Sequence, residues 1–134
     1  MERVSVMVPE TLRYTKDHEW LRLEPNGDAV VGITDYAQHE LGDITFVDLP
    51  QPGRAVKAHD ALAVVESVKA AGDVYAPVAG VVAAVNDALA DAPETVNREP
   101  YGAGWLCRLS GVDRAAVESL MAAPDYTAFL AAGR

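Results

Sequence analysis

The chain has 134 residues and a formal net charge of -9, from 20 Asp and Glu against 11 Lys and Arg. This charge argues against nucleic-acid binding, which needs clustered basic side chains beside the phosphates. Half of the residues are hydrophobic, as in folded proteins, and the length fits a single domain, residues 1–134.

Three features of the sequence indicate the compartment. Residues 1–16, MERVSVMVPETLRYTK, lack the apolar stretch of a signal peptide and the Arg- and Ser-rich pattern of a transit peptide. No apolar run approaches the length of a membrane span. The single cysteine, Cys107, cannot form an internal disulfide and is expected to be a small core residue. We therefore expect a cytoplasmic protein that does not bind a membrane.

Short apolar runs separated by Gly and Pro predict a chain made mainly of β-strands. The run at 18–24 alternates, with Trp20 on one face and Leu21 on the other. The Asn-Gly pair within 25–28 follows it. Because both of these residues tolerate positive φ, they predict a hairpin to a partner strand at 29–33.

A short helix is expected after this hairpin. Thr34 can cap its start, and Gly42 can end it in the left-handed conformation. Much further along, the segment at 87–104 has the composition of a long irregular connection. The remaining strands are expected at 43–50, 61–67, 73–77, 80–86 and 104–110.

The C-terminal tail has helical spacing instead. Asp113 is a candidate N-cap for a helix whose apolar residues include Val117 and Met121. Pro124 is expected to stop this helix, and Asp125 is expected to cap a second short one.

Lys69 lies between two strand-like runs in VVESVKAAGDVYAPVAG, residues 64–80. The spacing predicts a tight hairpin with this lysine near its tip, where the strands hold the backbone and the side chain is exposed. A deprotonated amine is a nucleophile that an enzyme can acylate. Most lysines are solvated surface groups, but this hairpin would suit a swinging prosthetic group.

Several sequence blocks occur in order along the chain: YTKDHEW, VGITDYAQHELGD, FVDLPQPG, VVESVKA, APVAG and NDALADAPETVNREPYGAGWL. Together they resemble the H-protein family of the glycine cleavage system, whose members carry lipoate. The resemblance covers about residues 12 to 130. It implies a mainly β hybrid of barrel and sandwich, with two antiparallel sheets, short helices and a helical C-terminus. The domain core would then lie at about 12–130.

The resemblance also implies a function. Lys69 would hold lipoate through an amide bond and carry the aminomethyl group of glycine between enzymes. These are a pyridoxal-phosphate glycine decarboxylase, a tetrahydrofolate-dependent aminomethyltransferase and the FAD enzyme dihydrolipoyl dehydrogenase. A lipoate ligase or lipoyl transferase would attach the group. The chain itself would be a non-catalytic carrier, and a carrier that serves several enzymes is expected to be a monomer.

Four acidic residues acquire expected roles from the same resemblance. Glu66, three residues before the lysine, resembles the residue that the modifying ligase recognises. Glu19, Asp17 and Asp73 are expected to line a shallow cleft for the arm, where carboxylates would accept hydrogen bonds from a protonated amine. The family often has Ser in place of Asp17, and all three could be ordinary surface acids. Gly72, in place of a common Ser, is expected only to loosen the turn.

Other functions fit the sequence less well. Biotin carriers usually place their lysine between two methionines, whereas Val68 and Ala70 flank it here. Lipoyl domains of 2-oxo acid dehydrogenases typically have a DKA motif and long linkers. An unmodified protein-binding β-domain leaves the ESVKA motif unexplained. An independent enzyme lacks a recognisable nucleophile–base pair, phosphate loop or metal cluster. An H-like protein that donates lipoyl groups to other lipoate-dependent enzymes remains an alternative.

Overall fold

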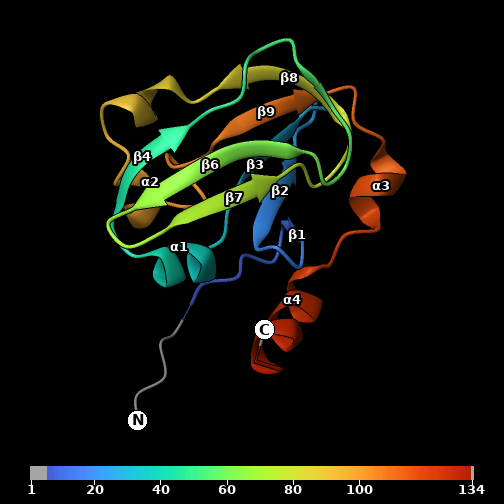
Figure 1. The fold of residues 1–134 in the computed structure, drawn as a ribbon. Coiled ribbons are helices and arrows are strands. Elements are labelled where there is room, and N and C mark those ends of the chain that lie inside the picture. The colour runs from blue at the N-terminus through green and yellow to red at the C-terminus, as the bar shows by residue number, and fades with distance from the viewer. Residues whose placement is uncertain (1–5, 134) are drawn as a thin grey trace.

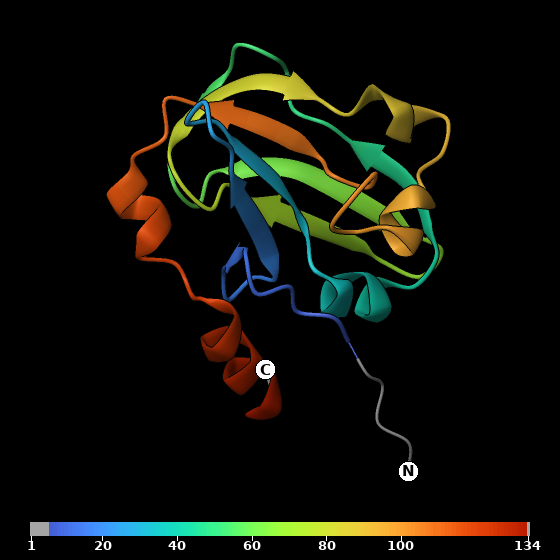
Figure 2. The same ribbon diagram turned by 180° about the vertical axis from the view of Figure 1, so that it is seen from behind.

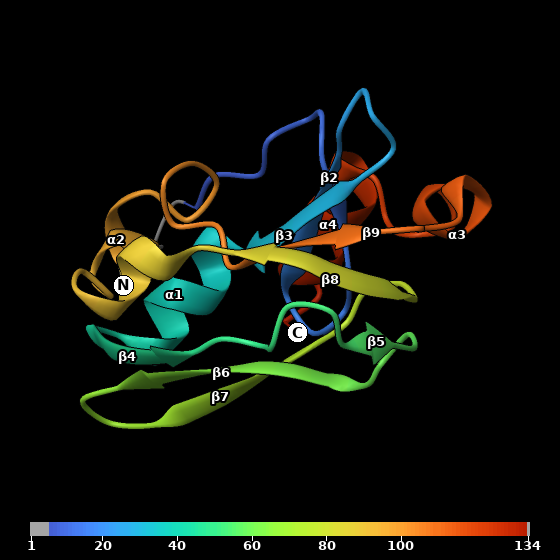
Figure 3. The same ribbon diagram turned by 90° about the horizontal axis from the view of Figure 1, so that it is seen from above.

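Two antiparallel sheets form the body of the protein, for which a computed structural model describes residues 6–133. The larger sheet has the strand order β1 (Arg13–Tyr14), β2 (Glu19–Leu23), β3 (Ala29–Ile33), β9 (Cys107–Ser110), β8 (Gly80–Val85) and β5 (Ala55–Val56). The smaller sheet has the order β4 (Ile44–Asp48), β6 (Ala61–Ser67) and β7 (Ala71–Tyr75). The two sheets form facing layers, with β6 and β7 below β8 and β9 in Figure 3. This confirms the expected barrel-sandwich hybrid.

Short helices lie at both ends of these layers. The helices α1 (Asp35–Leu41) and α2 (Thr95–Arg98) lie at one end, and α3 (Arg114–Glu118) lies at the other (Figures 1 and 2). The segment at 87–104 is not irregular as expected, because it contains α2 and a 3-10 helix, η1 (Asp87–Ala90). The two-residue strands β1 and β5 were not predicted either, since they are too short to give a pattern.

The hairpin of β2 and β3 forms as expected, but its turn differs in detail. In this turn Gly27 alone has positive φ, at 93°. Asn26 contributes through its side chain, whose Oδ1 accepts a hydrogen bond of 2.9 Å from the backbone N–H of Asp28. Both faces of β2 are buried, because Trp20 and Leu21 pack into different clusters.

Helix α1 has the expected cap. Thr34 Oγ1 accepts a hydrogen bond of 3.2 Å from the backbone N–H of Ala37. Gly42 follows the helix with φ 81° and ψ -157°. The positive φ that glycine permits is present, but the backbone is extended rather than left-handed helical, so that part of the expectation was wrong.

The C-terminal tail contains two helices whose boundaries differ from the expected ones. Asp113 caps α3 through a hydrogen bond from Ala115 N–H, as predicted. However, Pro124 does not end that helix. It lies in the first turn of α4 (Ala123–Ala131), whose N-cap is Ala122 rather than Asp125. Proline is compatible with a first helical turn because its missing N–H would have no helical partner there.

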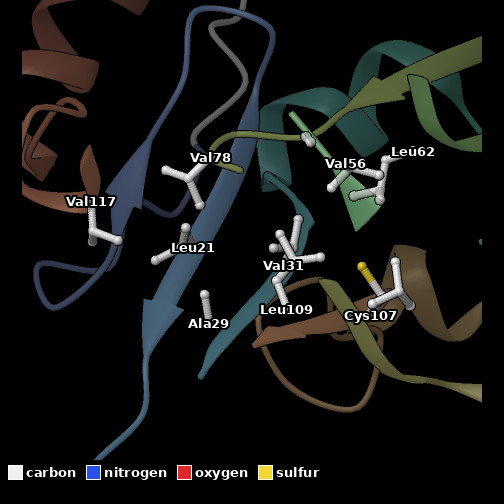
Figure 4. Close-up of a cluster of buried hydrophobic side chains, with 11 residues drawn as sticks. Leu21, Ala29, Val31, Val56, Leu62, Val78, Cys107, Leu109 and Val117 are labelled. Carbon is white, nitrogen blue, oxygen red and sulfur yellow. The ribbon is translucent and has the colours of Figure 1, made fainter. Parts of the chain in front are cut away.

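Three buried clusters hold these elements together. The first lies between the sheets and includes Leu21, Val31, Val78 and Leu109 (Figure 4). Cys107 belongs to it and is fully buried, as expected, and burial raises the pKa of its thiol to about 12. The second cluster lies beneath α1, and the third joins β1 and β2 to α4.

Candidate functional site

Lys69 lies at the tip of the β6–β7 hairpin and is exposed, as the sequence predicts. The turn is held by Ser67. Its backbone N–H donates to Ala70 O at 2.7 Å, and its Oγ accepts from Ala70 N–H at 3.1 Å. Val68 N–H donates to Asp43 O at 3.2 Å, which anchors the tip to the segment before β4. The backbone beneath the lysine is therefore fixed while its side chain is free to reach outward.

The Lys69 side chain runs beside the end of α1. Its Cε lies 3.5 Å from the point where a Cβ on Gly42 would stand. On the neighbouring strand, a Cβ on Gly72 would come within 3.2 Å of Leu41. Gly72 thus belongs to β7 and permits α1 to pack closely, so the expectation that it only loosens the turn was wrong.

A cavity of about 190 Å³ opens next to this hairpin. We call it the acidic cleft. Its walls are the turn at 17–19, helix α1 and strand β7. Asp17, Glu19 and Asp73, which the family resemblance placed in a cleft, all line it. Its other lining residues are His18, Ile33, Tyr36, Ala37, Glu40, Leu41, Gly72 and Val74.

Glu19 is the buried acid of the cleft, with 2% of its surface exposed. Oε1 accepts a hydrogen bond from the Thr15 hydroxyl at 2.6 Å, and Oε2 accepts one from the Tyr75 N–H at 3.0 Å. Burial raises the pKa of this carboxyl to about 7, although both hydrogen bonds favour the ionised form. Near neutral pH, Glu19 is therefore poised between a neutral acid and a carboxylate.

Asp17, Glu40 and Asp73 are the exposed acids at the rim of the cleft, one on each of its three walls. The Asp17 charge is close enough to Glu19 to contribute to its raised pKa. One buried and three exposed acids around an interior lined by Ile33 and Val74 can hold an apolar chain that ends in a cation.

Sequence reasoning missed several side chains of this cleft, and His18 is the most informative. It has φ 69°, which is uncommon for a residue other than glycine. Its Nδ1 lies 2.8 Å from the Tyr126 hydroxyl, and its ring lies 4.6 Å from that of Tyr36. Burial lowers the pKa of this imidazole. No local pattern predicts these contacts, because they join residues up to 108 positions apart.

Glu66 lies outside the cleft, on the outer face of the small sheet. It is exposed and is paired across the strands with Phe46 and Ala71. Phe46 keeps 51% of its surface exposed. A protein that approaches the lysine from this face would meet an acid and an aromatic ring side by side.

A larger hollow of about 560 Å³ lies elsewhere, between Tyr14–Asp17, the segment at 77–79 and α3. No residue of the lysine hairpin lines it. Size alone does not identify a site, and the acidic cleft is the candidate site because β7, a strand of the lysine hairpin, lines it. Over residues 6–133, no three metal-binding side chains are grouped, and no helix is long and apolar enough to cross a membrane.

The fold and the hairpin define a class of protein, namely the two-sheet barrel-sandwich proteins that present one lysine at a tight turn. Comparison with known proteins is more specific. The sequence profile of the family described as Glycine cleavage H-protein matches residues 12–133, and the chain belongs to this family.

Individual relatives agree with this assignment. The glycine cleavage system H protein of Cronobacter sakazakii is 56% identical over 123 residues, which are 92% of this chain and 95% of that protein. The protein of the same name from Escherichia coli O9:H4 is 55% identical over the same lengths. The crystal structure of a glycine cleavage system H protein from Mycobacterium marinum superposes with a TM-score of 0.84. It is 38% identical, and the match covers 92% of this chain and 99% of that one.

Proposed function

We propose that this chain is the lipoyl carrier of the glycine cleavage system, with lipoate joined by an amide bond to Nζ of Lys69. The observation that carries the proposal is the geometry of the hairpin. An exposed lysine stands on a fixed turn, beside a cleft lined by four acids. Membership of the H-protein family supports the same function. When bound, lipoate supplies a disulfide that takes up the aminomethyl group and is later reoxidised.

The residues around Lys69 fit such a group. Gly42 has no side chain where the lysine stem passes, and Leu41, the residue before it, lines the acidic cleft. Ile33, Leu41 and Val74 offer apolar contacts for a hydrocarbon chain, and the acids offer acceptors for an amine. The cleft therefore suits both the hydrocarbon chain of lipoate and the amine that it would carry.

Glu19 would bind the amine through its carboxylate. A cation beside it would favour the ionised form and so lower the pKa of this buried acid from its present value of about 7. Asp17 and Asp73 would add attraction from the rim, weakened there by solvent. The walls would also keep water from the carried carbon, which needs a closed environment rather than a catalytic group.

We propose that the protein catalyses no step itself. Its partners would be the pyridoxal-phosphate glycine decarboxylase, the tetrahydrofolate-dependent aminomethyltransferase and dihydrolipoyl dehydrogenase, together with a lipoate ligase or lipoyl transferase. With a net charge of -9, it would dock on basic surfaces of these enzymes. We further propose one lipoyl-carrier domain over 1–134, a monomer in solution, located in the cytoplasm. A relay of lipoyl groups would use the same lysine, but the relatives named above favour the carrier.

Mass spectrometry of the intact protein and of its peptides, after co-expression with a lipoate ligase, tests the proposal. A lipoyl adduct is expected on the peptide that contains Lys69 and on no other. Lys16 and Lys57, the other lysines of the chain, are internal controls. An unmodified protein, under conditions in which the ligase modifies a known acceptor, would overturn the proposal. If the protein is lipoylated, reconstitution with the three partner enzymes would distinguish a carrier of the aminomethyl group from a relay of lipoyl groups.

A further inference from the structure

The Tyr126 hydroxyl joins two segments that lie far apart in the sequence. It is 2.8 Å from His18 Nδ1 and 2.8 Å from Thr34 Oγ1. Tyr126 belongs to α4 and is fully buried. A hydroxyl has one proton to donate and lone pairs to accept, so it can serve both partners at once. The Tyr126 hydroxyl thereby connects the C-terminal helix to His18 and Thr34 in the interior of the protein.

These two partners are neighbours where the pairing of β2 with β3 ends. Thr34 N–H donates to His18 O at 3.0 Å, so the backbone itself fixes the spacing of the turn and the start of α1. His18 lies between Asp17 and Glu19 and lines the acidic cleft, whereas Thr34 caps α1. The contact of the Tyr126 hydroxyl with Nδ1 therefore adds the orientation of the His18 ring in the cleft wall.

The surroundings leave Tyr126 little freedom to move. Its ring stacks on Tyr14 with centroids 4.6 Å apart and planes 2° from parallel. Phe129 packs nearby, with its ring centroid 5.9 Å from that of His18 and 6.4 Å from that of Tyr126. A buried aromatic stack of this kind holds its members in one geometry. The position of the hydroxyl is thus set by packing, and its hydrogen bond with Nδ1 transmits that position to the His18 ring.

We propose that Tyr126 is a positioning residue for the acidic cleft, which holds the His18 ring in one orientation in the cleft wall through its hydroxyl. The C-terminal helix is then part of the device that shelters the carried group, although it lines no part of the cleft. The sheltering role rests on the proposed function. The hydrogen bond and its effect on the His18 ring do not depend on it.

Tyr126→Phe removes the bridging oxygen and keeps the stacked ring. Tyr14→Phe is the matched control, since its hydroxyl donates to Pro9 O and touches neither wall. Tyr126→Phe loses two hydrogen bonds and Tyr14→Phe loses one, in the same buried cluster, so both should lose stability and only the first should affect the His18 ring.

The first measurement uses the unmodified protein and NMR spectra of both variants. Tyr126→Phe is expected to shift the His18 ring nitrogen signals and the amide signals of Tyr36 and Glu40, which line the cleft. Tyr14→Phe is expected to leave these signals in place. If Tyr126→Phe left the Tyr36 and Glu40 signals unchanged, the proposal would be overturned, whether or not Lys69 carries lipoate.

The second measurement uses fully lipoylated protein loaded with the aminomethyl group. Tyr126→Phe is expected to speed the release of formaldehyde about fivefold, the effect of one lost hydrogen bond. His18→Asn, which tolerates positive φ but is too short to reach Tyr126, should have a similar effect. The double variant should be no faster than either alone, because both remove one bridge. Additive effects, or a release rate equal to that of Tyr14→Phe, would contradict the bridge while leaving the carrier function intact.

Discussion

Glu19 Oε2 lies 3.0 Å from the backbone nitrogen of Tyr75 and accepts its hydrogen bond. Glu19 begins β2 in the large sheet, and Tyr75 ends β7 at the edge of the small sheet. The carboxylate thus pairs with an N–H that faces away from its own sheet. Glu19 therefore joins the two sheets and also lines the acidic cleft. Its substitution should affect both the stability of the fold and the sheltering of the carried aminomethyl group.

Glu19→Gln should remove a pH dependence of stability. In the folded protein, burial raises the pKa of this carboxyl from its ordinary value of 4.5 to about 7. The stabilisation it contributes is fully present below pH 4.5 and is lost as the pH rises towards 7, by about 3 kcal/mol. In urea unfolding, the variant should therefore have a higher free energy of unfolding than the natural protein at pH 8, but not at pH 5. A difference that does not change between these pH values would contradict the raised pKa.

Lys69→Arg should abolish lipoylation and glycine cleavage. A guanidinium remains protonated and is not acylated under these conditions. Because the side chain is exposed on a turn held by backbone atoms and Ser67, the fold should be retained. Mass spectrometry, circular dichroism and thermal unfolding of the variant check the two halves of this expectation. A lipoyl adduct elsewhere on the variant would show that Lys69 is not the attachment site.

Glu66→Gln should slow lipoylation by roughly tenfold, the typical effect of losing a charge-assisted hydrogen bond. Asp48→Asn is the control, because Asp48 is an exposed acid of β4 in the same sheet, farther from the lysine. Initial rates with purified ligase provide the measurement. Equal slowing of both variants would mean that the ligase responds to overall charge and not to Glu66.

Gly32→Ala should destabilise the protein by about 2 kcal/mol, because a larger side chain must force a rigid neighbour aside. A Cβ here would stand 2.6 Å from the Trp20 ring, which is fixed by a hydrogen bond of 2.9 Å from its Nε1–H to Pro100 O. Gly72→Ala should cost much less, since it meets the flexible end of Leu41 at 3.2 Å. Chemical unfolding of the two variants compares these effects directly. Equal losses would show that the Trp20 ring can yield.

Local features of the structure could be predicted from the sequence, because their causes are local. The alternation of apolar residues, the Asn-Gly turn and the Thr34 cap each act over a few positions, and all three elements form. The exposed position of Lys69 followed from the same kind of pattern. The acids of the cleft did not, since their placement came from family resemblance and only the fold brings them together.

Features that depend on long-range packing could not be predicted. Pro124 is compatible with either the end or the start of a helix, and the contacts of Tyr126 with Tyr14 and Thr34 settle α4 in its place. The positive φ of His18 and the raised pKa of Glu19 also arise from neighbours distant in sequence or from burial. The sequence by itself determined the longer strands and the lysine at the hairpin tip, through short-range preferences of the backbone. Only the tertiary structure decided the walls of the acidic cleft, the charge state of Glu19 and the orientation of the His18 ring, because these depend on side chains that meet when the two sheets and α4 pack together.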